Sequence, residues 1–282
     1  MRKTSKTNPI QPDSSVRQFQ FGMGLHDGTQ YNFFAGDKVF SVRLIESYDV
    51  SHQSAWYYDG EIHEITLENR PLAKRRENHV DVSTENFSLK ADDDGGSLIA
   101  GAETAKACRV TFTSPLTYCW GTPGEAAVIH QPLLDASIDY CGHTLKAVGY
   151  CKRFWFRHQT DYLAWRFIEG ELDSGNTMLW TADGNFGGDY QKYDYFKIVT
   201  RTGKLKQADD TGSYHRDDSA YAEIDGIKHT ATIEPLGTWS CVLRGKDTNL
   251  KLRQRFCRLT LNYANITMTG FAINETGVGA IR

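Results

Sequence analysis

The sequence lacks the features that would place it in or across a membrane. No apolar run approaches the roughly 20 residues that a helix needs to span a bilayer. The first 15 residues, MRKTSKTNPIQPDSS, are basic and then polar, without the apolar middle of a secretory signal. We therefore expect a cytoplasmic protein with no membrane insertion, beginning with a flexible N-terminal arm over residues 1–15.

The sequence also lacks paired cysteines and an excess of charge of one sign. None of the six cysteines belongs to a C-x-x-C pair, and their spacings match no zinc site. In a reducing compartment we expect them to be free and mostly buried thiols. The formal net charge of −3 gives no general attraction to nucleic acid, so we expect no nucleic-acid partner.

The standard catalytic signatures are missing as well. There is no G-x-S-x-G, no H-E-x-x-H and no G-x-x-x-x-G-K-[ST]. Glu61 and His63 lie two residues apart, as metal ligands on a strand sometimes do, but a third ligand cannot be named and a solvated acid and histidine is the better interpretation. These absences predict chemistry that needs no cofactor and no metal.

What is present is a period-two alternation of apolar and polar residues. It recurs in runs such as 38–45, 54–68, 109–114, 220–233 and 265–274, bounded by turn motifs such as YDG and DDDGG. Many short strands of this kind predict an all-β protein of antiparallel barrels or sandwiches. The stretch 122–136 interrupts the alternation, and we take it as a domain border, giving β domains over 16–133 and 134–282.

The segment GYCKRFWFRHQTDYLAWRFIEG (149–170) is unusually rich in rings and charges. Side chains two apart on a strand share a face. One face of its first strand is therefore expected to carry Cys151, Arg153, Trp155 and Arg157, and the other Tyr150, Lys152, Phe154, Phe156 and His158. In its second strand Trp165 and Glu169 share a face, with Arg166 opposite. The first strand fits two interpretations. It is either one wall of a ligand pocket that excludes water and orients a polar group, or a solvated face with arginines stacked on Trp155.

The next segment, 177–198, favours the wall of a ligand site. It brings Trp180, Asp183, Phe186 and four further aromatic residues directly after this strand pair. Buried Tyr and Trp need hydrogen-bond partners, so ordinary cores use them sparingly. Such density is typical of a cavity for a large, mostly apolar ligand held by rings and a few polar groups.

The motifs G-Y-C-x-R-x-W-F, DYLAWRFIEGELDSG, LWTADGNFG, YDYFK and GFAINETGVG resemble the AttH-like / carotenoid hydratase (hydroxyneurosporene synthase) superfamily. The resemblance is best over 137–282. It implies two lipocalin-like β domains that enclose an apolar substrate, with activities that include hydration of isolated double bonds and cyclisation, Diels–Alder chemistry among them. Hydratase members tend to carry Asp-His after the Gly-Tyr pair, whereas Cys151 and Lys152 follow Tyr150 here. This departure favours cyclisation over hydration.

We therefore predict a cofactor-independent cyclase or isomerase, Diels–Alderase-like, that acts on a polyketide- or terpenoid-like substrate in natural-product biosynthesis. The alternatives are a hydratase of a terpenoid or carotenoid double bond and a lipocalin-type carrier without catalysis. The candidate catalytic residues are His158, Asp161, Glu169 and Arg153. The candidate substrate-binding residues are Trp56 and Tyr58 from the first domain, together with Tyr150, Trp155, Arg157, Trp165, Arg166, Trp180 and Glu275.

Overall fold

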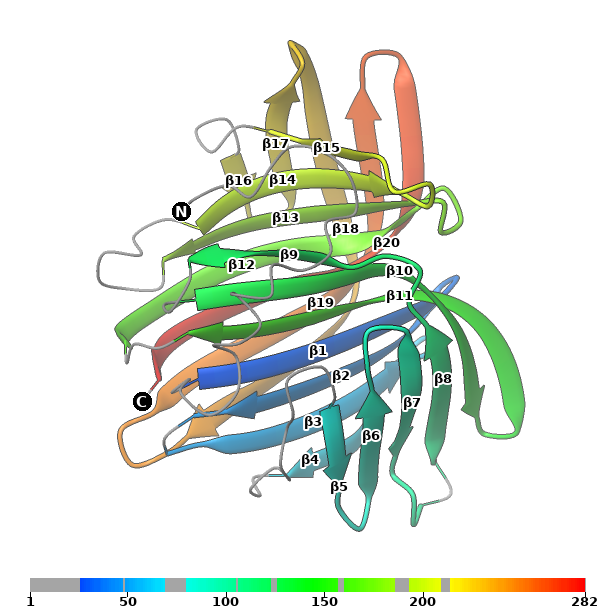
Figure 1. Cartoon of the computed structure of the whole chain (residues 1–282), viewed down its shortest axis with the longest axis vertical. Helices are drawn as coiled ribbons and strands as arrows, with labels where there is room; N and C mark the ends of the chain where they lie inside the picture. Colours follow the sequence, from blue (N-terminus) through cyan, green and yellow to red (C-terminus); the bar gives the residue numbers. More distant parts are fainter. Residues whose placement is uncertain are drawn as a thin grey trace. The chain divides into compact units, whose positions relative to one another are not determined.

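The computed structural model describes residues 26–281, apart from 48, 69–79, 105, 123–125, 157–159, 186–192 and 209–213. The predicted N-terminal arm lies outside this range. Strands and turns make up the described part, in two antiparallel sheets of 11 and 9 strands, with no helix in it (Figure 1). No helix of that part is thus long and apolar enough to cross a membrane. The predicted all-β, lipocalin-like fold is confirmed.

Contacts group the chain into two compact units. The first unit comprises Met1–Tyr57 and His63–Gln159, and the second comprises Tyr58–Ile62 and Thr160–Arg282. The first sheet has the order β4-β3-β2-β1-β11-β10-β8-β7-β6-β5, and β9 also pairs with β10. Its strands are β1 His26–Ala35, β2 Lys38–Glu46, β3 Ser51–Tyr58, β4 Ile62–Glu68, β5 Val80–Ser83, β6 Phe87–Ala91, β7 Gly95–Ala100, β8 Cys108–Thr113, β9 Tyr118–Thr122, β10 Ala126–Tyr140 and β11 His143–Phe156.

The second sheet has the order β15-β14-β13-β12-β20-β19-β18-β17-β16. Its strands are β12 Thr160–Leu172, β13 Thr177–Asn185, β14 Tyr193–Thr200, β15 Leu205–Gln207, β16 Tyr214–Arg216, β17 Ser219–Ile224, β18 Ile227–Arg244, β19 Asn249–Tyr263 and β20 Ile266–Ile281. Two-residue turns close some of its hairpins: Ile224 pairs with Ile227 across Asp225 and Gly226, which both have positive φ. Asp-Gly is a favoured sequence for that turn because Gly and Asp tolerate a left-handed backbone.

The structure does not divide where the alternation is interrupted. β10 runs continuously through the border predicted at 133/134, and the two units divide instead at Gln159/Thr160. The interruption is a β-bulge: the pairing of β10 with β11 shifts between Gln131 and Leu134, and Leu133 has a φ of 55°. A bulge inserts extra residues into one strand, so it breaks the period of two without ending the strand.

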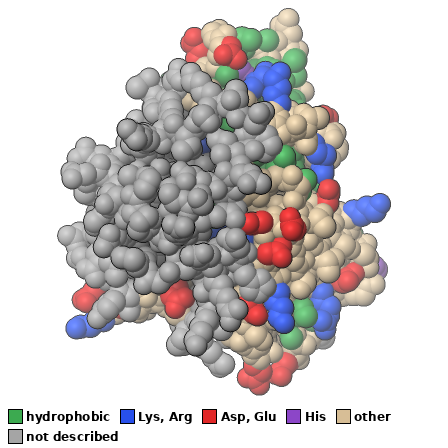
Figure 2. Space-filling view, in the orientation of Figure 1, with side chains coloured by type: hydrophobic (Ala, Val, Ile, Leu, Met, Phe, Trp, Pro, Cys, Tyr) green, Lys and Arg blue, Asp and Glu red, His purple; other side chains and the backbone are tan. Residues whose placement is uncertain are grey.

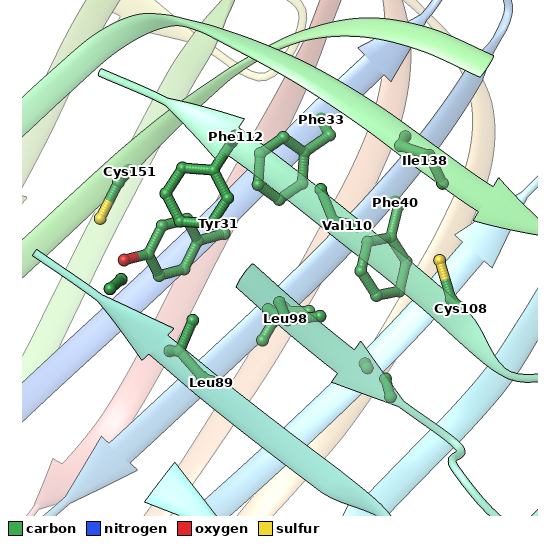
Figure 3. Packing of buried hydrophobic residues seen from close by; sticks show 14 of the residues in the cluster. Tyr31, Phe33, Phe40, Leu89, Leu98, Cys108, Val110, Phe112, Ile138 and Cys151 are labelled. Carbon is green, nitrogen blue, oxygen red and sulfur yellow. The ribbon is translucent and has the colours of Figure 1, made fainter. Parts of the chain in front are cut away.

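An apolar cluster packs on one face of the first sheet, which we call its core face. Figure 3 shows rings from β1 and β8, among them Tyr31, Phe33 and Phe112, packed beside Leu89 and Leu98. Burying each such side chain contributes about 1.5–3 kcal/mol relative to leaving it exposed. A second cluster, with Ile168, Leu179 and Phe196, packs on the core face of the second sheet. Each unit therefore has its own core.

The surface in the view of Figure 2 carries acidic and basic side chains interspersed with each other. The large hydrophobic residues exposed in the described part come from several strands of both sheets, and they are Leu67, Leu205, Tyr221, Ile227, Val242, Ile266 and Val278.

Candidate functional site

Several predicted site residues gather on the second sheet, on the face opposite its apolar core. Because Ile168 and Leu172 of β12 face the core, Trp165, Phe167 and Glu169 face the other way. Cross-strand pairing adds neighbours to this face: Trp180 of β13 pairs with Glu169, and Glu275 of β20 pairs with Phe167. We call this the carboxylate–indole face; its principal residues are Trp165, Phe167, Glu169, Trp180, Tyr195, Gln254 and Glu275.

Glu275 is held in a fixed orientation on this face. Its side chain is 1% exposed, and the Trp165 indole Nε1–H donates to its Oε1 over 2.8 Å. The Gln254 amide Nε2–H donates to Oε2 over 2.9 Å, so both carboxylate oxygens accept a hydrogen bond. Hydrogen bonds to an ionised acceptor are shorter and stronger than neutral ones. Glu275 therefore fixes the edge of the Trp165 ring.

Glu169 forms the second acidic point of the face. It is also 1% exposed, and the Tyr195 hydroxyl donates to its Oε1 over 3.2 Å. Tyr195 lies on β14, in register with Ala182 of β13, which in turn pairs with Phe167. A buried carboxylate bonded to a phenol is an arrangement that can give and take back a proton.

A glycine makes room for the Trp165 ring. A Cβ atom on Gly277 of β20, the cross-strand partner of Trp165, would lie 2.2 Å from the indole Cζ2. The ring thus lies directly over the Gly277 backbone, an approach that no other residue type allows. Packing and the bond to Glu275 together place this indole.

A second buried polar surface lies within the first unit, also opposite its apolar core. The register of β10, β11, β1 and β2 aligns His130, Lys152, Gln30 and Arg43 in one row across four strands. All four are at most 3% exposed, and Arg43 Nη2–H donates to Gln30 Oε1 over 2.8 Å. Buried cations of this kind are costly unless they interact with polar groups or ligands.

Neighbouring rows of that surface contain aromatic and amide groups. Tyr150 pairs with Asn32 across β11 and β1, and its ring stacks with His130 at a centroid distance of 6.4 Å. By alternation, His52 and Trp56 of β3 share this face, since Ala55 and Tyr57 belong to the core cluster. The face predicted for Tyr150 and Lys152 is confirmed.

The structure therefore places the predicted residues in four different surroundings. Glu169, Trp165, Trp180 and Glu275 come together on the carboxylate–indole face of the second unit. Tyr150 and Trp56 lie on the buried polar surface of the first unit, whereas Arg153 lies on the core face of its sheet, paired with Thr29 of β1. Arg166 is on the core face of the second sheet, where Nη2 contacts Asp217 Oδ1 at 2.7 Å.

The sequence analysis assigns Tyr58 to the first domain, but in the structure Tyr58 belongs to the second unit. Its hydroxyl donates to the Leu236 carbonyl over 3.3 Å and its ring lies 5.2 Å from that of Phe256. Tyr58 is the last residue of strand β3. The contacts of Tyr58 group this residue with β18 and β19. The candidates Arg157 and His158 lie outside the described residues, as do the side chains of Trp155 and Asp161.

The sequence pattern does not single out Gln254, His130 or Arg43, and it includes Tyr195 only among the aromatic residues of 177–198. A signal existed for Gln254: in NLKLRQRF it follows Leu250 and Leu252 at period two, so it is a polar residue within an apolar series. His130 lies just before the bulge between Gln131 and Leu134, where the break in the period of two hides the strand from the sequence pattern.

The described residues contain no group of three or more His, Cys, Asp or Glu side chains placed to hold a metal ion. What the carboxylate–indole face offers is two carboxylates, a phenol and indole rings in dry surroundings.

No protein-family model matches the sequence, and no curated protein matches it at a significant level. Solved structures do match over nearly the whole chain. An AttH candidate from Nitrosomonas europaea superposes with a TM-score of 0.64 at 12% identity, covering 97% of this chain and 98% of that one. Kievitone hydratase from Nectria haematococca gives 0.64 at 12% identity, covering 97% and 95%.

CghA superposes with a TM-score of 0.53 at 11% identity, covering 98% of this chain and 96% of its own. CghA has also been crystallised with Sch210972. The resemblance expected from the sequence motifs is confirmed as a likeness of fold. At 11–12% identity this likeness shows the fold alone.

Proposed function

We propose that this protein is a cofactor-independent cyclase or isomerase that holds a mostly apolar substrate against the carboxylate–indole face. The observation that supports this most is the pairing of buried Glu169 with Tyr195 beside Trp165, whose indole is fixed by Glu275. Both carboxylates are 1% exposed, and hydrogen bonds from neighbouring side chains offset the cost of burying them.

The proposed mechanism needs only this chain's own side chains. Cyclisation and isomerisation leave the atoms of the substrate unchanged, so any proton that the enzyme gives must be recovered. The Glu169–Tyr195 pair supplies and recovers it, passing a proton to a substrate carbonyl or alkene and taking one back. The indole of Trp165 limits the conformations of a flexible substrate, which lowers the entropic part of the barrier.

The test is incubation with a panel of linear polyenes that carry a carbonyl group next to one alkene. Products are separated by chromatography and their masses are determined by mass spectrometry. Incubation of the same polyenes in buffer alone serves as the control. The proposal predicts at least one substrate converted to a product of unchanged mass, with a product ratio different from that in buffer. We expect Glu169→Gln to lower its rate about 100-fold or more, and Tyr195→Phe to lower it less.

The matched control is Glu223→Gln, which removes a carboxylate from an exposed position on β17 of the same unit and leaves the rate unchanged. A product heavier than its substrate by one water would identify a hydratase instead. Tight binding of the panel without any change in product distribution would identify a carrier, and would contradict the proposal.

A further inference from the structure

Arg153 of β11 is a buried cation outside the carboxylate–indole face. Its side chain is only 6% exposed, and none of its three guanidinium nitrogens makes a well-formed hydrogen bond to any residue in the described part of the chain. Buried polar groups are nearly always hydrogen-bonded, and an unsatisfied buried charge is the most costly exception.

Two further polar atoms without hydrogen bonds lie in the next row of the same sheet. The register places Gln131, Cys151 and Tyr31 side by side across β10, β11 and β1, directly beside the row of Arg153. The Tyr31 hydroxyl, in a side chain with no exposed surface, makes no well-formed hydrogen bond to a described residue, although it lies close enough to the Cys151 thiol and the Arg153 guanidinium to interact with both. The Gln131 carbonyl oxygen has no hydrogen-bond partner among the described residues. Figure 3 shows the Tyr31 oxygen and the Cys151 sulfur at the same end of the apolar cluster.

The Tyr31 phenol and the Cys151 thiol do not neutralise Arg153 near neutral pH. Burial raises the pKa of Tyr31 well above its usual value and also raises the pKa of the Cys151 thiol. Burial lowers the pKa of the Arg153 guanidinium, but the fields of Tyr31, Cys151 and Asp93 raise it overall. The fields of Tyr31 and Cys151 act only when these groups have lost their protons, which their raised pKa values prevent. Arg153 thus stays charged beside a neutral phenol and a neutral thiol, and the field of the Asp93 carboxylate favours that charge.

The amide of Gln131 is held rigidly at this position. Its Nε2–H group donates to the Asp93 carbonyl over 3.0 Å and to the Ser114 hydroxyl over 3.1 Å. This anchoring leaves the amide oxygen turned away from those partners and available to a hydroxyl or a water. The two adjacent rows therefore combine one cation, one O–H donor and one fixed acceptor, at the polar end of an otherwise apolar cluster.

We propose that this end of the first unit is a binding site for a carboxylate, with Arg153 as its ion-pair partner and the Tyr31 hydroxyl as a second donor. A carboxylate accepts the forked N–H groups of a guanidinium in two parallel hydrogen bonds. The site does not depend on the proposed cyclase activity. Its carboxylate belongs either to a small free acid or to a larger, mostly apolar ligand.

The experiment is a ligand-observed NMR titration of the full chain with sodium benzoate, sodium acetate and benzamide. Benzamide has the shape of benzoate but no charge, so it isolates the contribution of the ion pair. We expect benzoate to bind at least about tenfold more tightly than benzamide. Acetate binding as tightly as benzoate would show that a small free acid suffices; much weaker acetate binding would show that the ligand also needs an apolar part.

Variants locate the site. We expect Arg153→Met to weaken benzoate binding about tenfold or more, and Tyr31→Phe, which keeps the ring in the core, to weaken it by a smaller factor. Arg109→Met, which removes an exposed cation from β8 of the same unit, serves as the control and leaves binding unchanged. Equal binding of benzoate and benzamide by the unmodified protein, no binding of either anion, or unchanged binding in Arg153→Met would overturn the proposal.

Discussion

At the scale of single residues, the carboxylate–indole face follows from the cost of burying polar atoms. Glu275 is tolerated at 1% exposure because an indole N–H and an amide N–H bond its two oxygens. The same bonds fix the donors, so the position of Trp165 depends on Glu275 as much as the reverse. The hydrogen bonds between Glu275 and its two donors replace the bonds that these groups would make to water.

Trp165→Phe tests this interdependence. The substitution keeps most of the ring but removes the N–H, so Glu275 loses one of the two donors described for it. We expect the free energy of unfolding to fall by about 1–3 kcal/mol in urea denaturation. The variant Glu275→Gln should lower stability too, and the double variant should cost less than the sum of the two single ones. Strict additivity would mean that the two side chains do not interact.

Gly277→Ala tests the close approach of the ring to β20. The added Cβ would lie 2.2 Å from Trp165 Cζ2, so the indole must move. Overpacking of this kind typically costs about 1–3 kcal/mol of unfolding free energy. We expect that loss in urea denaturation, together with lower activity on any substrate found, whereas Val278→Ala at the exposed neighbouring position has little effect. Combining Gly277→Ala with Trp165→Leu should recover part of the stability; no recovery would contradict the account.

At the scale of elements, period-two alternation predicted the strands and their faces wherever the strand was regular. It correctly opposes Cys151 to Tyr150 and Trp165 to Arg166, and so places Glu169 with Trp165 on one face. The alternation does not predict the bulge at Leu133. A left-handed backbone is usually marked by Gly, Asn or Asp, and here the residue is leucine. Nor could the alternation pair Glu275 with Trp165, which lie 110 residues apart.

The hairpin between β12 and β13 has a carboxylate at its base that makes stability depend on pH. Glu171 Oε2 accepts the Gly175 N–H over 2.9 Å, and burial raises the pKa of Glu171 above its ordinary 4.5. The folded state therefore binds this proton more tightly than the unfolded state. The contribution of Glu171 to stability is fully present below pH 4.5 and is lost as pH rises through the raised folded pKa.

Glu171→Gln should remove that part of the pH dependence, since the amide oxygen can still accept the Gly175 N–H. We expect the stability of the unmodified protein relative to the variant to decrease as pH rises from about 4 to 7. The measurement is a series of urea denaturations across this range, with the exposed Glu223→Gln as control. Parallel curves for the protein and its Glu171 variant would contradict the assignment.

At the scale of the whole molecule, the chain forms two β units, each with a separate apolar core. The free thiols report on both cores: Cys108 and Cys151 are buried in the first unit and Cys257 in the second, whereas Cys141 is exposed in a hairpin turn. Burial raises the pKa of Cys257 to about 12 and that of Cys108 further still. Thiolates are the reactive form, so these thiols are doubly protected.

We therefore expect a thiol reagent at pH 8 to label Cys141 within minutes and to leave Cys108, Cys151 and Cys257 unlabelled until the protein is unfolded. Labelling at increasing urea concentrations, followed by peptide mass mapping, gives the order in which the buried thiols become accessible to the reagent. Their opening reports the stability of each unit separately. Rapid labelling of Cys257 or Cys151 in the folded protein would contradict the described packing.

The central claim is that an apolar guest lies against the carboxylate–indole face, and fluorine NMR of protein labelled with 5-fluorotryptophan tests it most directly. Each tryptophan gives its own resonance, assigned with single Trp→Phe variants, and the uncharged polyene diphenylhexatriene is added as the guest. The account predicts that the Trp165 and Trp180 resonances shift together and saturably as the polyene binds. Binding seen by polyene fluorescence while both resonances stay in place, or no binding at all, would contradict it.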